Sequence, residues 1–373
     1  MSDAKGIGEV GYFDNIGGGQ IVVDRGHAFI GHMKAPHGTS IVDVRDPKKP
    51  RQVASIEIPE GIHSHKVRVG NGLMLVNHEV MRDDIDDATE YGGGLAIYDI
   101  ANPAAPKLIH KWATPGKGVH RFDFDGRYFY GSATQAGYSG TIVMILDLID
   151  PTKPREVGRW HMPGQWLAGG EKPTWGAADD KRCHHPLRFG DRLFTSYWHG
   201  GFVILDISDM SKPKFVSGLD WSPPFMCPTH SAVLVPFPIN GRRVMLVADE
   251  DVAKIGVGPP AFLWLVDITD ETRPVPFASF QLDHLGDKEA PPMTGCHQPV
   301  EKITGMEVPV AWFANGLRVV DISKPHAPRE VAHYVPDVPE GSRRVSSNDV
   351  FVDERGLIYL LDRVRGLHIL ERI

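Results

Sequence analysis

A sequence unit that recurs along the whole chain is the feature that most constrains the fold. The unit is a glycine, an apolar and largely β-branched run, an aspartate and then a turn that contains proline. Its copies are Gly38-TSIVDVRDPKKP, Gly94-LAIYDIANPAAP, Gly140-TIVMILDLIDPTKP, Gly201-FVILDISDMSKP, Ala261-FLWLVDITDETRP, Gly316-LRVVDISKPHAP and Gly366-LHILERI. The aligned acidic residues, 48 to 61 positions apart, are Asp43, Asp99, Asp147, Asp206, Asp267, Asp321 and Glu371. This period is typical of propeller blades or of a solenoid.

Each copy of the unit lies within a segment that can supply four strands. In the second copy, strands are expected at 65–69, 72–79, 94–100 and 106–113, with the Asp-x-x-x-Pro turn between the last two. Proline fixes φ and aspartate accepts hydrogen bonds from the following amides, so the turn is chemically specified. Four antiparallel strands at this period form one blade of a β-propeller.

The two ends of the chain favour a closed ring over a solenoid. The last copy stops after its third strand, at Ile373, whereas the first residues, Gly8-EVGYFDN, resemble the fourth strands Arg155-EVGRWHM and Arg329-EVAHYVP. We expect the N-terminal segment to supply the missing outer strand, because ring closure protects the sheet edges. The sequence therefore predicts an all-β fold, in which residues 1–373 form a single domain, a seven-bladed propeller closed by its N-terminal strand.

Composition and charge argue against several classes of protein. The formal charge of -7 and the lack of a Lys/Arg run argue against nucleic-acid binding. No stretch approaches the roughly 18 apolar residues that a membrane span needs, and residues 1–6 lack the apolar core of a signal peptide. We therefore expect a cytoplasmic protein that binds neither membranes nor nucleic acid; its oligomeric state stays open.

Histidines recur at one position of the repeat. In a propeller the first strand of each blade lines the central axis, and in five consecutive blades this strand begins with a histidine. These residues are His65, His120, His185, His230 and His297, while blades seven and one have Asn348 and roughly Gln20. Because strand side chains alternate, we expect the neighbouring His63 and His184 to point elsewhere.

Imidazole is a good ligand for Fe, Mn, Cu, Ni and Zn. We expect three or four of the five histidines to hold one transition-metal ion, iron first and Mn, Zn or Cu as alternatives, with the open side towards blades seven and one. The alternative is a structural habit of the repeat, in which the histidine caps a loop or bonds a neighbouring blade. The absence of this histidine from blades seven and one argues against a purely structural role.

The ends of the second strands are expected on the same face and carry further candidates. His78 and His199 are candidate metal-associated residues, and Glu79 and Glu250 are candidate carboxylate ligands or general bases, with solvated loop charges as the alternative. The cysteines also lie near this face, where a thiolate would favour Cu, Zn or Fe and a buried thiol would act as a small apolar residue. They are Cys183, Cys227 and Cys296.

Long loops over the same face are candidates for substrate binding, since long loops in compact domains are often functional. They span about 163–183, 221–229, 283–296 and 336–347. The aromatic candidates for an apolar pocket are Trp166, Trp175, Trp198 and Phe225, and Arg343 and Arg344 are candidates for holding an anionic group. The alternative is that the aromatic residues pack the loops down and the arginines are solvated.

The Ile-Val-Asp-Ile units resemble those of the LVIVD-repeat β-propeller proteins over nearly the whole chain. That resemblance implies the blade fold and leaves the reaction open. In fold and in a histidine-lined mouth, the chain is also similar to the selenium-binding and methanethiol-oxidase propellers. The arrangement further resembles the seven-bladed carotenoid-cleaving oxygenases, which hold iron with four histidines.

Two classes of function follow from these patterns. The first is a metal-dependent enzyme acting on a small organic molecule; histidine ligands without an obligatory carboxylate favour an oxygenase or oxidase. A Zn- or Mn-dependent hydrolase or lyase, with Glu79 or Glu250 as base, is the alternative enzyme. The second class is a non-catalytic interaction scaffold, which would not require five aligned imidazoles.

Overall fold

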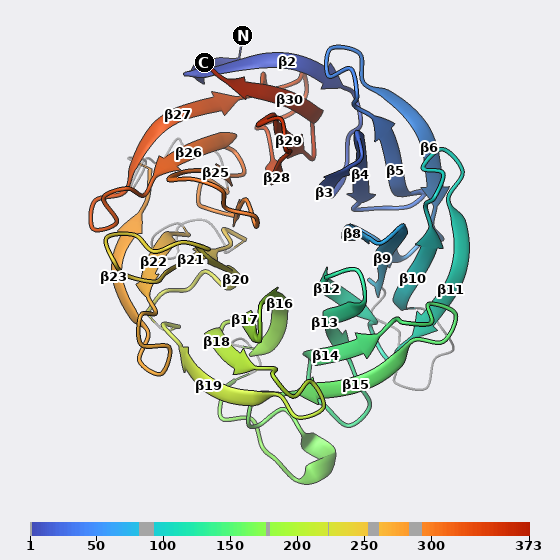
Figure 1. Ribbon diagram of the computed structural model, residues 1–373, viewed down its shortest axis with the longest axis vertical. Helices are drawn as coiled ribbons and strands as arrows, with labels where there is room; N and C mark the ends of the chain where they lie inside the picture. The colour runs from blue at the N-terminus through green and yellow to red at the C-terminus, as the bar shows by residue number, and fades with distance from the viewer. Residues whose placement is uncertain (1, 82–92, 177–179, 223, 253–260, 283–292) are drawn as a thin grey trace.

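Seven antiparallel sheets stand around a central axis and form a closed ring (Figure 1). This computed structural model describes residues 2–81, 93–176, 180–222, 224–252, 261–282 and 293–373. The prediction of a seven-bladed propeller with four-stranded blades is confirmed. Within the described ranges, no helix has the length and apolar character that a membrane crossing requires.

In blades one to six the strands run from the axis outwards in chain order, and in blade seven the outermost strand comes from the N-terminus. Blade one comprises β3 (Gly18–Asp24), β4 (His27–His32), β5 (His37–Asp43) and β6 (Arg51–Glu57). Blade two comprises β8 (Val67–Gly70), β9 (Leu73–Val80), β10 (Gly94–Asp99) and β11 (Lys107–Ala113), and the short β7 (Ile62–His63) pairs with the end of β9. Blade three comprises β12 (Val119–Phe124), β13 (Tyr128–Thr134), β14 (Thr141–Asp147) and β15 (Arg155–Trp160).

The remaining blades repeat this order. Blade four comprises β16 (Arg182–Phe189), β17 (Arg192–Trp198), β18 (Gly201–Asp206) and β19 (Lys214–Leu219). Blade five comprises β20 (Thr229–Leu234), β21 (Val244–Asp249), β22 (Leu263–Asp267) and β23 (Val275–Phe280). Blade six comprises β24 (Gln298–Pro299), β25 (Glu307–Ala311), β26 (Leu317–Asp321) and β27 (Arg329–Val335). Blade seven comprises β28 (Ser347–Val352), β29 (Ile358–Asp362), β30 (Gly366–Arg372) and the N-terminal β2 (Ile7–Phe13).

The N-terminal strand closes the ring as the sequence predicts. Strand β2 pairs antiparallel with β30, with Gly8 opposite Glu371, and the two ends of the chain meet at the top of Figure 1. One feature was not predicted: β1 (Asp3–Lys5) continues onto blade six, where it pairs with β27 as a fifth strand. The N-terminal segment therefore ties two adjacent blades together.

The repeated aspartate has the turn-forming role expected of it. In six blades its Oδ1 accepts a hydrogen bond from the backbone N–H two residues later, as in Ala101 to Asp99 at 2.8 Å and Ile149 to Asp147 at 3.0 Å. The same bond occurs at Asp43, Asp206, Asp267 and Asp321. The apolar runs before these aspartates are buried on both faces, because each blade is packed between two others. Phe29 and Ile41 of blade one, for example, pack with Met74 and Ala96 of blade two.

Candidate metal centre

A β-bulge at the start of the innermost strand decides which residues face the axis. In blade four Cys183 pairs with Tyr197 and His185 pairs with Ser196, so His184 is an extra residue on its strand. The same shift occurs in blades three, five, seven and one, where the extra residues include His120, His230, Asn348 and Gly19. The residue of blade four that is equivalent to His120 and His230 is therefore His184.

The expectation that His184 points away from the axis was wrong, because an inserted residue interrupts the alternation of side chains along a strand. The predicted ligand His185 lies in the next layer instead. Its Nε2 is 3.3 Å from Nη2 of Arg68 and 3.5 Å from Oε1 of Glu301. At blade one, the ring position belongs to Gly19 rather than to Gln20.

Five imidazoles form a continuous histidine arc over blades two to six. The ring centroids are separated by 5.1 Å from His65 to His120, 4.8 Å from His120 to His184, 4.7 Å from His184 to His230 and 4.1 Å from His230 to His297. At the remaining two positions, the side-chain amide of Asn348 donates to the carbonyl oxygen of Gly19. The arc is thus confined to the five blades that the repeat pattern indicated.

Four imidazoles in or beside the arc share one hydrogen-bond pattern. Each places Nδ1 against an oxygen that can only accept, so Nδ1 carries the hydrogen and Nε2 keeps its lone pair. The acceptors are Met33 O for His63 at 2.7 Å, Glu79 Oε2 for His120 at 2.7 Å, His230 O for His184 at 2.8 Å, and Asn348 O for His297. Metal-ligating histidines typically have this pattern, since the Nδ1 partner fixes the tautomer and orients the ring.

The Nε2 atoms of His120 and His184 lie 3.0 Å apart. In the neutral rings both atoms carry lone pairs, so they repel unless a proton or a cation lies between them. Burial lowers the pKa of His184 well below its usual range, which opposes the protonated alternative at that residue. Two nitrogens that each lie about 2.1 Å from one ion, at about a right angle, are about 3.0 Å apart. The pair has the spacing of two adjacent ligands of one metal ion.

A second close contact between candidate ligand atoms occurs at the far end of the arc. His297 Nε2 lies 3.3 Å from Oε1 of Glu250. Burial lowers the pKa of His297 to about 4. Burial opposes the charge of Glu250, but its hydrogen bond with His297 and nearby cations lower the pKa of its carboxyl group to about 2. That hydrogen bond needs a proton between the imidazole and the carboxylate, and a cation could take its place.

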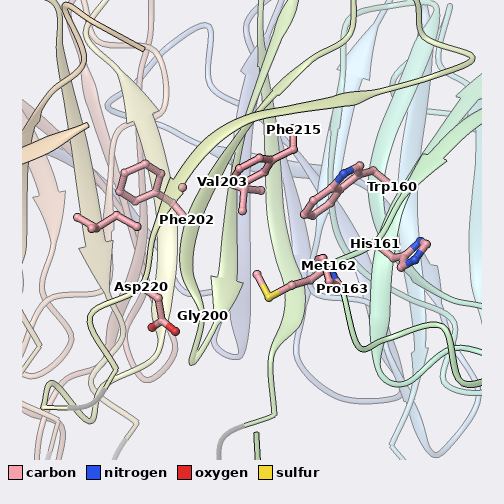
Figure 2. Close-up of a pocket in the computed structure, with 11 residues that line it drawn as sticks. Trp160, His161, Met162, Pro163, Gly200, Phe202, Val203, Phe215 and Asp220 are labelled. Carbon is pink, nitrogen blue, oxygen red and sulfur yellow. The ribbon is translucent and has the colours of Figure 1, made fainter. Parts of the chain in front are cut away.

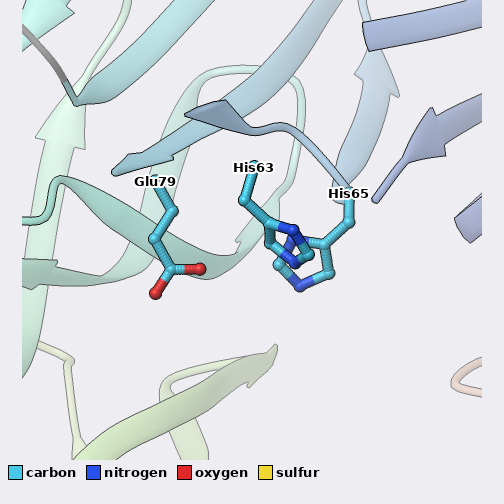
Figure 3. A group of neighbouring side chains, drawn as sticks. All are labelled: His63, His65 and Glu79. Atoms are coloured by element: carbon cyan, nitrogen blue, oxygen red, sulfur yellow. The ribbon is translucent and has the colours of Figure 1, made fainter. Parts of the chain in front are cut away.

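The candidate ligand atoms fall into two groups within the described residues. Those of His63, His65 and Glu79 lie within 4.8 Å of one another, and so do those of His184, His230 and Glu250. Figure 3 shows the first group, with the two imidazoles beside each other and the Glu79 carboxylate facing them. The expectation that His63 points elsewhere was therefore wrong: it lies on the separate strand β7, so alternation within β8 does not determine its direction.

Buried charges form a layer beneath the arc, which the sequence analysis missed. Arg121 donates to Nε2 of His230 and, at 2.7 Å, to Oε1 of Gln298. Arg68 is ion-paired with Glu301. The signal was present in the sequence, because the residue after each ring position is polar in all seven blades. Those residues are Gln20, Lys66, Arg121, His185, Ser231, Gln298 and Asp349.

The predicted catalytic residues divide into two pairs. Glu79 and Glu250 both reach the arc, through His120 and His297 respectively. His78 precedes Glu79 on β9 and so points to the opposite face of that strand, where Lys111 is its electrostatic neighbour. His199 lies in the turn between β17 and β18, with a left-handed φ of 50° and its ring 6.1 Å from Trp198.

Of the predicted aromatic substrate contacts, Trp198 lies against the arc, with its ring centroid 4.8 Å from that of His184. Trp166 stacks on Tyr138, next to the 3-10 helix η1 (Leu167–Gly169), in a loop that projects beyond the ring in Figure 1. Trp175 lies beside Lys181, 5.9 Å from the ammonium to the ring centroid. Phe225 packs on Phe262 and Trp264. Residues 177–179, 223 and 283–292 of the predicted loops lie outside the described ranges.

The remaining predicted residues are two arginines and the cysteines. Arg343 is exposed, whereas Arg344 is half-buried and donates to Sδ of Met293 at 2.7 Å. Burial raises the pKa of the Cys183 and Cys296 thiols well above their usual range, and that of Cys227 to about 12. All three side chains are buried, which agrees with the alternative, in which the cysteines act as small apolar residues.

A separate hollow of about 420 Å³ lies between the outer parts of blades three and four. Figure 2 shows Trp160, Met162 and Phe215 along it, with His161 and Asp220 towards its ends. Its lining is mainly apolar and belongs to the outer strands, so it is distinct from the histidine arc.

The repeated unit of this chain also matches a known family of repeats. The LVIVD-repeat family model matches residues 90–114, 190–220 and 308–335. The chain carries LVIVD repeats. These repeats cover the third and fourth strands of blades two, four and six, the part of the blade that contains the aspartate turn. Among proteins with curated descriptions, none is similar to the chain in sequence.

Solved structures share the fold of this LVIVD-repeat propeller at low sequence identity. A Lactobacillus plantarum protein is 12% identical, with a TM-score of 0.61 over 88% of this chain and 85% of that chain. The periplasmic gluconolactonase PpgL of Pseudomonas aeruginosa is 11% identical, with a TM-score of 0.60 over 93% and 96% of the two chains. Sqt1 of Saccharomyces cerevisiae is 10% identical, with a TM-score of 0.58 over 96% and 86%. At such identities the likeness concerns the fold alone.

Proposed function

We propose that the protein is a metal-dependent enzyme whose single transition-metal ion is held by Nε2 of His120 and of His184, with a further donor from the flanking histidines of the arc. The 3.0 Å separation of these two lone-pair nitrogens is the observation that carries the proposal. A cation bound at this point would be held by both lone pairs, in place of the single proton that a hydrogen bond between the two rings would share. The hydrogen-bond acceptors at both Nδ1 atoms keep the rings oriented for it.

The favoured reaction class is an oxidation of a small organic molecule by an oxygenase or oxidase. The donors nearest the proposed site are imidazoles, which suit redox-active Fe or Cu. When bound, such an ion would supply redox and Lewis-acid chemistry. The chain itself orients His120 through Glu79 and covers one side of His184 with Trp198, and Glu250 at the His297 end of the arc is a candidate acceptor for a proton from a bound molecule.

Hydrolysis or lyase chemistry with Zn or Mn is the second candidate. The buried carboxylate of Glu250 favours it, since a carboxylate at the arc can serve as general base. The gluconolactonase PpgL gives the same fold an enzymatic precedent. Metal identity and oxygen consumption separate the two: Fe or Cu with oxygen uptake supports oxidation, while Zn or Mn without uptake supports hydrolysis or a lyase reaction.

The deciding experiment is elemental analysis of protein purified without added metal. We expect about one transition-metal ion per chain, lost in His120→Ala and His184→Ala and kept in His185→Ala. The last variant is a matched control, because His185 is the adjacent residue, is also buried, and contacts Arg68 and Glu301 instead. Less than about 0.2 ion per chain in the wild type, or equal content in all variants, would refute the metal site and favour an interaction scaffold.

A further inference from the structure

Beside the His297 end of the arc lie two arginines with few partners. We propose that Arg363 and Arg344 form a subsite for a carboxylate group of the substrate. The assignment of this subsite to a substrate rests on the proposed function. Anion binding by the two arginines does not itself require the metal.

The backbone of Arg363 is held in place between neighbouring blades. Arg363 lies in the turn between β29 and β30, where its N–H donates to Ser346 O at 2.9 Å and its carbonyl accepts from Gly17 N at 2.8 Å. Its guanidinium carbon lies 5.6 Å from the ring centroid of Phe313, and that ring lies 4.3 Å from His297. One aromatic ring therefore separates the guanidinium from the end of the histidine arc.

The Arg363 side chain has no hydrogen bond or ion pair to any described residue, and its Nε is buried. The adjacent carboxylate, Asp362, is already saturated. Its Oδ1 accepts from Val364 N and Arg365 N, and its Oδ2 accepts from Ser346 N and Ser347 Oγ, all between 2.8 and 2.9 Å. Glu250 attracts Arg363 electrostatically but is engaged by His297. A donor-rich cation near the His297 end of the arc thus has no hydrogen-bond acceptor among the described residues.

Arg344 adds a second cation whose hydrogen-bond acceptors are weak, although Asp362 and Asp251 attract it electrostatically. Its Nη2 donates to the thioether of Met293, a weak acceptor, and its Nη1 donates to Val345 O at 3.3 Å. Arg344 and Arg363 repel each other, and burial lowers the pKa of both. Since burying a charge is costly unless it is paired, an oxyanion shared by the two guanidiniums would relieve both the repulsion and the desolvation.

The charges around the subsite favour a carboxylate over a phosphate group. Glu250 contributes a further carboxyl group to the same electrostatic neighbourhood, so a dianion would meet more repulsion there than a monoanion. Phe313 offers an apolar surface for the carbon chain of a carboxylic acid, next to His297. A molecule held by its carboxylate at Arg363 would extend over that ring towards the arc.

The test is isothermal titration of propionate, benzoate and inorganic phosphate into the wild type and three variants. We expect carboxylates to bind more tightly than phosphate, and Arg363→Met or Arg344→Met to weaken carboxylate binding by at least about tenfold. Arg343→Met is the matched control, because this exposed neighbour of Arg344 should leave binding unchanged. Arg363→Lys, which keeps the charge, should bind at an intermediate level and covers the case in which Arg363→Met does not fold.

Titrations of chelator-treated protein separate this inference from the proposed function. Two results together support the subsite. Carboxylates should still bind after the metal is removed, and the arginine variants should keep the metal content of the wild type. Carboxylate binding in a protein that never holds metal would refute the proposed enzyme and leave the anion site standing. Equal binding by the wild type, Arg363→Met and Arg344→Met, tighter binding of phosphate, or no binding of any probe would overturn the inference.

Discussion

Oε2 of Glu79 accepts a hydrogen bond from Nδ1 of His120 at 2.7 Å. This contact joins the end of β9 in blade two to the start of β12 in blade three. It fixes which nitrogen of His120 carries hydrogen and turns the other nitrogen towards His184. Burial opposes the charge of Glu79, but the interaction with His120 lowers the pKa of its carboxyl group below the ordinary value. Glu79 therefore stays ionised and acts here as the partner that orients the ring.

Removal of the Glu79 carboxylate should weaken metal binding without removing a ligand. We expect Glu79→Ala to lower the affinity about 10- to 100-fold, as found when such hydrogen-bond partners of metal-binding histidines are lost. Competition with a chromophoric chelator measures the change. Glu60→Ala, at an exposed position, is the control; an affinity for Glu79→Ala equal to that of the wild type would mean that His120 needs no such partner.

The repeated glycine before the third strand should be required by a close approach to the fourth strand. Gly201 has a φ of 66°, and a Cβ there would lie 1.9 Å from the carbonyl oxygen of Leu219. Gly241 has a similar φ of 78° but open space around its Cβ position. We expect Gly241→Ala to lose roughly 1 kcal/mol of stability, because only the left-handed conformation is unfavourable there. Gly201→Ala should lose more, and chemical denaturation measures both. Equal losses would show that the backbone moves aside without cost.

Closure by β2 should contribute more to stability than the extension by β1. Deletion of residues 2–13 removes the strand that pairs with β30 and exposes its edge, so we expect a lower melting temperature and aggregation. Deletion of residues 2–5 removes only β1, whose three residues are exposed, and should have little effect. Thermal unfolding with light scattering compares the two. Similar behaviour of both deletions would contradict the role of β2 in closure.

The turn aspartates should make stability depend on pH in the acidic range. The hydrogen bond from Arg127 holds the pKa of Asp147 below its ordinary value. The stabilisation is present above the pKa of the unfolded chain, about 3.9, and is lost as the pH falls through the lower folded-state value. We expect Asp147→Asn to lose roughly 1 to 2 kcal/mol at neutral pH and less of that difference near pH 2.

Urea denaturation at several pH values measures this dependence. Asp14→Asn, in the exposed segment after β2, is the control and should follow the wild type throughout. A stability difference between Asp147→Asn and the wild type that is independent of pH would mean that the charge of Asp147 contributes nothing.

The fold could be predicted because each blade repeats the same local chemistry. The aspartate and proline of each turn specify the connection between the third and fourth strands, and the likeness of Gly8-EVGYFDN to other fourth strands predicted the closure. The attachment of β1 to blade six was not predicted, because three exposed residues, Asp3 to Lys5, carry no apolar pattern.

Most of the histidine arc could also be predicted, because the strand start recurs at a fixed place in the blade. The sequence by itself determined that five consecutive blades bring one imidazole each to the axis. Only the tertiary structure decided that blade four presents His184 and sends His185 to Arg68 and Glu301. The reason is physical: a β-bulge arises from pairing with the neighbouring strand, so a pair of adjacent histidines carries no local mark of which one faces the axis.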